Sequence, residues 1–177
     1  MFATKAIFAL LPFAFTQISQ GAPSPATLTL SEILYHQSEV YSTPAHLATY
    51  GGYIDFNLTN SNPAVPGIIH CSAVGMHLTE MFFGEFNYTC ASPAGVATNF
   101  TYDRPTNGFT LNQTWSEDGR KAYLASGQGS TDLSCKYTSW TNSNWTMGQL
   151  YHTENVDCAP GQLVITPEIT EISGTYH

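Results

Sequence analysis

Residues Thr98–Trp115 read TNFTYDRPTNGFTLNQTW, and this stretch decides the fold class. Apolar and polar residues alternate in both of its halves. The first half places Phe100 and Tyr102 on one face, and the second half places Phe109 and Leu111 on one face. A period of two residues is typical of an antiparallel strand with one buried face and one face in water. The stretch therefore predicts two β-strands.

The turn residues fit the same reading. Asn107-Gly108 and Asp118-Gly119 are hairpin signals, because these residue types tolerate the positive φ of tight turns. The alternation recurs in Gly52–Leu58 and Glu85–Cys90, whereas Ser31–Tyr41 alone has a weak helical periodicity. Further strand candidates are Thr27–Leu30, Glu32–His36, Ile68–Ala73, Ala122–Ala125, Leu133–Thr138, Thr146–Tyr151 and Leu163–Thr166. Short strands at regular spacing predict an all-β barrel or sandwich.

Large aromatic residues fall on the inward positions of these strands. They are Phe56, Phe86, Phe100, Phe109 and Trp115. Side chains of this size predict a filled interior rather than a hollow one.

The first residues resemble a targeting signal. Lys5 precedes the apolar run Ala6–Phe15, which is too short to span a bilayer, and small residues follow it. We expect a secretory signal peptide over residues 1–21, with cleavage after Gly21, and one domain over residues 22–177. The mature chain is expected to be secreted and extracellular.

Four cysteines follow this leader: Cys71, Cys90, Cys135 and Cys158. An even number of cysteines in a secreted chain predicts two disulfides. Three pairings are possible, and we favour the sequential one, Cys71–Cys90 with Cys135–Cys158. The spacing C-x-x-C is missing from the sequence, which disfavours a metal site.

The amino-acid composition restricts the classes of partner that the chain can bind. The formal net charge is −8, and only 10% of the residues are charged. Such a chain repels phosphate backbones and anionic membrane surfaces, so we expect neither as a partner. Five N-x-T sequons occur, at Asn57, Asn87, Asn99, Asn112 and Asn144. The first four fall on the polar face of a predicted strand, where an attached glycan would point to solvent.

No catalytic motif is found in the sequence. A nucleophile elbow, an H-E-x-x-H zinc motif, a phosphate-binding loop and a dinucleotide fingerprint are all missing. His70 and His77 are seven residues apart, which fits no common ligand spacing. We expect no catalytic residue, no metal and no cofactor. A glycosidase needs two facing carboxylates, and candidates for such a pair are Glu80, Glu85, Asp103, Glu117 and Asp118.

Aromatic residues gather in Tyr137–Trp145, which reads YTSWTNSNW. Amphipathic rings among small polar residues are typical of recognition surfaces. Tyr137, Trp140 and Trp145 are thus candidates for a partner-binding loop. The alternative is that both tryptophans flank a hairpin and pack inward.

Several segments together resemble the secreted fungal family of the major Alternaria allergen. They are LSEILY (Leu30–Tyr35), GGYIDFNLTN (Gly51–Asn60), IIHCSA (Ile68–Ala73), FNYTC (Phe86–Cys90), NFTYDRPTNGFTLNQ (Asn99–Gln113) and VDCAPGQLVI (Val156–Ile165). The resemblance lies in their order, with two cysteines in each half of the chain.

The resemblance implies a single antiparallel β-barrel of about eleven short strands with two intrachain disulfides. By position these are Cys71–Cys90 and Cys135–Cys158. It also implies a non-enzymatic effector or elicitor that binds a host (plant) extracellular protein. The alternatives are a barrel for a small flavonoid-type ligand and a secreted carbohydrate-active enzyme. The founding allergen forms a covalent dimer through an extra cysteine, but none lies between Ala22 and Ile69. A disulfide-linked dimer is therefore not expected, and the flavonoid site that depends on it is doubtful.

Overall fold

The computed structural model describes residues 25–45, 48–80, 86–117, 119 and 121–172. The expected signal peptide, the candidate carboxylates Glu85 and Asp118, and part of the Asp118-Gly119 turn lie outside these residues. Within them the structure has eleven strands, one short 3₁₀ helix (η1, Met76–Leu78) and no α-helix. None of its described helices is long and apolar enough to cross a bilayer.

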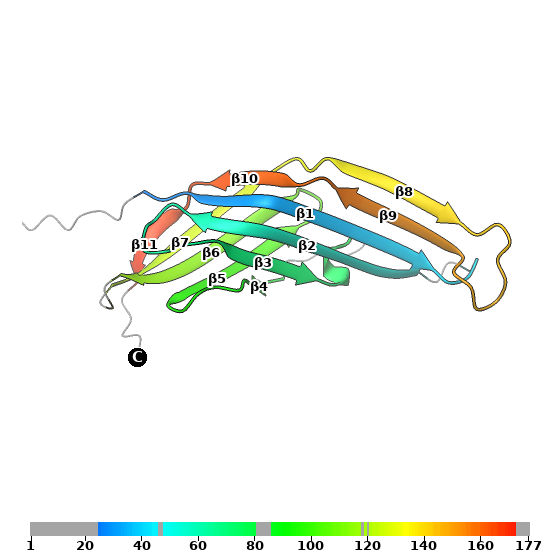
Figure 1. Ribbon diagram of the computed structural model, residues 1–177, viewed down its shortest axis with the longest axis horizontal. Helices are drawn as coiled ribbons and strands as arrows, with labels where there is room; N and C mark the ends of the chain where they lie inside the picture. Colours follow the sequence, from blue (N-terminus) through cyan, green and yellow to red (C-terminus); the bar gives the residue numbers. More distant parts are fainter. Residues whose placement is uncertain (1–24, 46–47, 81–85, 118, 120, 173–177) are drawn as a thin grey trace, which may run out of the picture.

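The strands form two antiparallel sheets (Figure 1). Sheet A has the order β3-β2-β1-β9-β8, with β10 also paired to β1. Its strands are β1 (Leu28–Tyr41), β2 (Ala48–Asn60), β3 (Ile69–Val74), β8 (Cys135–Thr141), β9 (His152–Cys158) and β10 (Gly161–Ile165). Sheet B has the order β11-β7-β6-β5-β4. Its strands are β4 (Tyr88–Thr89), β5 (Val96–Asp103), β6 (Gly108–Glu117), β7 (Lys121–Ser130) and β11 (Glu168–Ile172).

The predicted single barrel is wrong, because the two sheets do not join into one closed ladder. On one side, the only backbone pairing between the sheets among the described residues is an isolated bridge between His70 and Ala91. On the other side, the side chain of Ile165 on β10 packs onto Gly127 of β7, where an added Cβ would lie 2.6 Å from Ile165 Cγ2. β10 pairs with β1 and not with β7, so this contact is side-chain packing and not a ladder. The spacing of the short strands predicted either a barrel or a sandwich, and two stacked sheets are closer to a sandwich.

Several strand predictions need correction. Ser31–Tyr41 is not helical but belongs to β1, which also merges the two short strands predicted there. Thr146–Tyr151 is a loop before β9, and β11 was not predicted. A hairpin at Asn107-Gly108 is confirmed, since it joins β5 to β6 and Asn107 has φ 48°. The two-residue turn that these residues predicted is wrong, because Asp103 pairs with Gly108 and residues 104–107 form the loop.

The core lies between the sheets and is filled by aromatic rings, as predicted. The Phe56 ring lies edge-on to the rings of Phe100 and Phe109, with centroids 4.9 and 5.6 Å away. Trp115 is also buried. Phe86 is the exception among the predicted inward residues, because it is 37% exposed and stacks on His77 with centroids 3.8 Å apart.

A buried polar network also joins the sheets. Gln113 on β6 and Thr98 on β5 are fully buried. The Asn60 side-chain amide of sheet A donates to Gln113 Oε1 at 2.7 Å, and Gln113 Nε2 donates to Thr98 Oγ1 at 3.0 Å. These bonds satisfy groups that would be costly to bury alone.

The sequential disulfide pairing is confirmed. Cys71–Cys90 links β3 of sheet A to the end of β4 in sheet B. Cys135–Cys158 joins two directly opposed residues of β8 and β9. One bridge therefore fastens sheet to sheet, and the other fastens the edge strand β8 to its only neighbour in sheet A.

Candidate functional site

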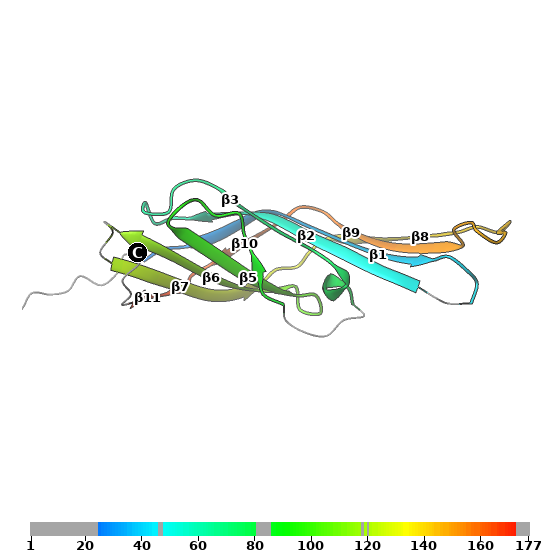
Figure 2. The ribbon, with the colours of Figure 1, turned by 90° about the horizontal axis from the view of Figure 1, so that it is seen from below.

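Sheet A is longer than sheet B and projects beyond it (Figure 2). We call the projecting part the ribbon, made of residues 36–41, 48–53, 135–141 and 152–158 of β1, β2, β8 and β9. Sheet B does not lie under the ribbon (Figure 2), and the ribbon's inner face is covered instead by η1 at Gly52 and by Glu80 at Gln37. This is where we look for a site.

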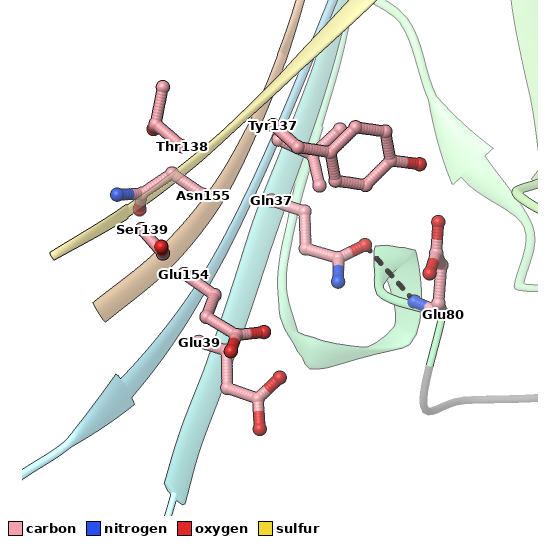
Figure 3. Close-up of a pocket in the computed structure, with 9 residues that line it drawn as sticks. Gln37, Glu39, Glu80, Tyr137, Thr138, Ser139, Glu154 and Asn155 are labelled. Carbon is pink, nitrogen blue, oxygen red and sulfur yellow. Dashed lines mark hydrogen bonds between the residues drawn. The ribbon is translucent and has the colours of Figure 1, made fainter. Parts of the chain in front are cut away.

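A pocket of about 210 Å³ lies on this inner face (Figure 3). Its lining residues are Gln37, Glu39, Glu80, Tyr137, Thr138, Ser139, Glu154, Asn155 and Val156. The side chains of Thr138 and Asn155 point to the other side of the strands, as alternation requires (Figure 3). We call this site the acidic pocket, because three glutamates line it.

Gln37 forms the buried floor of the acidic pocket, with 7% of its surface exposed. Its Oε1 accepts the backbone N–H of Glu80 at 3.2 Å and lies 2.9 Å from the Tyr35 hydroxyl. A backbone N–H can only donate, so this contact fixes which end of the amide is oxygen. The Nε2 group therefore points into the pocket, and no described residue accepts a hydrogen bond from it (Figure 3).

Two carboxylates lie side by side on the wall of the pocket. Glu39 of β1 and Glu154 of β9 are directly opposed in the ladder, so their Cβ atoms are neighbours on one face. The Tyr41 hydroxyl donates to Glu39 Oε1, and His152 Nε2 lies 3.1 Å from Glu154 Oε1. Like charges in this position repel, and no described lysine or arginine is paired with either glutamate.

The third glutamate is held differently. Glu80 Oε1 lies 3.0 Å from the guanidinium of Arg104, which stacks over the Tyr35 ring at 4.6 Å. The Arg104 side chain is only 10% exposed. Glu80 is thus neutralised by a largely buried cation, whereas the negative charge of the pocket rests on Glu39 and Glu154.

The tyrosines around the pocket are kept protonated. Burial raises the pKa of Tyr35 to about 12, against the opposing effect of Arg104. The hydrogen bond to Glu39 raises the pKa of Tyr41 to about 12, and interaction with Glu39 also raises that of Tyr50. These hydroxyls are hydrogen-bond donors at any physiological pH.

The three predicted recognition aromatics do not form one patch. Tyr137 is 67% exposed and lines the acidic pocket. Trp140 is 51% exposed and lies on the opposite face of β8, since it is three positions along the strand from Tyr137. Trp145 is an anchor of the loop, and its indole N–H lies within hydrogen-bond reach of the Gln149 and Ser42 carbonyl oxygens at 2.8 and 3.2 Å.

The end of the ribbon carries exposed apolar side chains. Beside Trp140, the β8–β9 loop presents Met147, which is 92% exposed, and Leu150, which is 41% exposed. We call Trp140, Met147 and Leu150 the apolar tip. In Figure 1 the loop between β8 and β9 lies at the end of the molecule opposite to sheet B.

The three candidate carboxylates that the structure describes do not come together. Glu80 lines the acidic pocket, but Asp103 accepts a hydrogen bond from Thr106 in its turn, and Glu117 accepts one from Trp115 at 3.4 Å. His70 and His77 are apart as well: His70 lies 3.4 Å from Asp55, and His77 stacks on Phe86. No described group of three or more His, Cys, Asp or Glu could hold a metal ion.

Sequence reasoning missed Glu39 and Glu154. They are far apart in the chain, and only the register of β1 against β9 brings them together. The alternation in β1 places Glu39 on the same face as Tyr35 and Gln37. It does not predict that β9 is the neighbouring strand or that Glu154 lies opposite Glu39.

The sequons lie on exposed or half-exposed positions. Asn99 and Asn112 are directly opposed on the outer face of sheet B, and Asn87 and Asn144 are exposed. Asn57 lies on sheet A, and its amide donates to Glu32 Oε2 at 2.7 Å. Glycosylation of all five stays a prediction.

Comparison with known proteins places the chain in a family. The family model described as Alternaria alternata allergen 1 matches residues 34–158. Searches of the curated proteins and of the solved structures find no match. The matched region runs from β1 to the last residue of β9 and includes all four cysteines. Since it spans well over half of the sequence, the chain belongs to the Alternaria alternata allergen 1 family.

Proposed function

We propose that this chain is a secreted, non-enzymatic, effector-like or elicitor-like protein that acts by binding a host extracellular protein. The observation that carries the proposal is the apolar tip. Large apolar side chains rarely stay this exposed at one end of a molecule unless something covers them, and Trp and Met are enriched at protein interfaces.

The geometry of the ribbon supports this use. β8 is an edge strand of sheet A, and all its residues after Cys135 are exposed. The strand is fastened to β9 by Cys135–Cys158, so the surface it presents is ordered before any partner arrives. A preordered surface loses little conformational entropy on binding.

Two features weigh against the alternative of a ligand carried inside the fold. The interior is filled by Phe56, Phe100 and Phe109, and the three described pockets open to solvent rather than lying enclosed between the sheets. A flavonoid-sized ligand between the sheets would have to displace these rings.

The test is a comparison of three immobilised proteins exposed to extracellular fluid from plant tissue. One is the natural chain, one carries Trp140→Ser, Met147→Ser and Leu150→Ser, and one carries Ile68→Ser, Val74→Ser and Val164→Ser. The control residues are also exposed, at 69, 77 and 57%, but lie outside the tip. A protein retained by the natural chain and the control but not by the tip variant supports the proposal. Equal retention by all three, or no retained protein, contradicts it.

A further inference from the structure

We propose that the acidic pocket binds a saccharide that carries a protonated amino group, such as one unit of a glucosamine oligosaccharide. This goes beyond the proposed function, since it concerns a small-molecule site on the inner face of the ribbon and does not depend on the apolar tip or on a protein partner.

The pair Glu39 and Glu154 favours a bound cation, although His152 Nε2 already lies 3.1 Å from Glu154 Oε1. Two opposed carboxylates repel each other, and the one arginine at the pocket is already paired with Glu80. Both glutamates face the cavity (Figure 3). A protonated amine placed between them would donate charge-assisted hydrogen bonds to both and remove the repulsion.

A simple cation does not satisfy the rest of the pocket. Only 7% of the surface of Gln37 is exposed. Its Nε2 group points into the cavity, and no described residue accepts a hydrogen bond from it. Gln37 Nε2 is not among the buried atoms without a partner, so solvent can reach it in the empty pocket. An ammonium or guanidinium group has only donors, so a ligand of this kind alone would displace that solvent and offer Nε2 no acceptor, which is costly. The ligand must therefore also carry an acceptor oxygen close to its charge.

A sugar hydroxyl supplies that oxygen, because it accepts and donates at once. It can accept from Gln37 Nε2 while a neighbouring hydroxyl meets Ser139, which also lines the pocket. The ring of Tyr137, 67% exposed, forms a further wall on which the C–H face of a pyranose can lie. Charge, acceptor and apolar face occur together in an amino sugar, and the volume of about 210 Å³ admits one such ring.

The test is calorimetric titration of the full mature chain with a glucosamine hexamer at about pH 6, where its amines are protonated. The matched probes are the N-acetylglucosamine hexamer, a glucose hexamer and spermidine. The variants are Glu39→Gln with Glu154→Gln, Tyr137→Leu, and Glu168→Gln as a control. Glu168 is an exposed carboxylate on β11 of sheet B, so its removal lowers the negative charge without touching the pocket.

We expect saturable binding of the glucosamine hexamer that weakens about tenfold or more in the double glutamate variant and several-fold in Tyr137→Leu. Binding should be unchanged in Glu168→Gln, and both neutral hexamers should bind at least about tenfold more weakly than the glucosamine hexamer. Any of four results would overturn the proposal. They are no binding, equal binding of the N-acetylated or glucose hexamer, equal loss in Glu168→Gln, and equal binding of spermidine with no effect of Tyr137→Leu. Since Tyr137 and the glutamates are largely or partly exposed, these variants are expected to fold.

Discussion

Removal of the Cys135–Cys158 disulfide should loosen one edge of the molecule and leave the rest intact. The bridge closes a loop with a sequence separation of 23 residues. The chain-entropy treatment of such a loop gives a stabilisation of about 3.4 kcal/mol. Because β8 pairs only with β9 and its residues after Cys135 are exposed, we expect that most of this loss appears as local opening of β8.

The assay is hydrogen–deuterium exchange of a Cys135→Ser, Cys158→Ser variant against the natural chain. If β8 opens alone, its amides that donate hydrogen bonds to β9 should exchange up to about 300-fold faster. This factor is the ratio of exchange rates that corresponds to about 3.4 kcal/mol. Amides of β6 and β7, in the other sheet, should keep their protection. The matched variant Cys71→Ser, Cys90→Ser removes a buried bridge between the sheets and should lower protection in both.

Two results would refute this reasoning. Unchanged protection in β8 would mean that the bridge adds nothing to a strand already held by its ladder. An equal loss of protection in β8 and in β6–β7 would mean that the ribbon does not open independently of the core.

Four more outcomes follow from the structure. Gln113→Ala should lower the free energy of unfolding, measured by urea titration, by about 2–5 kcal/mol. The substitution leaves Asn60 and Thr98 without their partner and creates a cavity. A loss below about 1 kcal/mol would contradict this. The pKa of Tyr35 is raised from 10.0 to about 12, so the unfolded chain releases this proton first, and stability should fall as the pH rises from 10 to 12; the fall should be shallower in Tyr35→Phe, and identical curves would argue against it. In a yeast host, Asn87→Gln and Asn144→Gln should each remove the mass of one glycan, since both side chains are exposed; an unchanged mass would show an empty sequon. Glucosamine and glucose hexamers should stay intact after prolonged incubation with the chain, as judged by mass spectrometry, and shorter products would contradict the non-enzymatic proposal.

The sequence predicted strands best where alternation is unbroken. In β5 and β6 the buried residues are evenly spaced, and a recognisable turn joins the strands. In β1 the pattern breaks, because a bulge between Leu30 and Ile33 shifts the buried positions from even to odd residue numbers. That shift split one 14-residue strand into two predicted ones and produced the weak helical period.

The architecture and the site were harder to predict for a different reason. Whether two sheets close into a barrel depends on contacts such as Ile165 on Gly127, which no local pattern encodes. The pairing of Glu39 with Glu154 depends on the register of strands far apart in the chain. The loop after β8 was predicted as a strand at Thr146–Tyr151, although Gly148 there has φ 90° and Trp145 is tied to Gln149.

The unbroken run of β1 from the core to the tip has a mechanical consequence. Its first half pairs with β10 beside the core, and its second half pairs with β9 in the ribbon. This strand of 14 residues thus acts as a beam. One end packs in the core against sheet B, and the other end lies in the ribbon beyond sheet B (Figure 2). Force applied at the tip is carried along the backbone of β1, through the bulge between Leu30 and Ile33, to the end that pairs with β10. Substitutions at the exposed positions of the ribbon should therefore leave the packing of the other end of β1 unchanged.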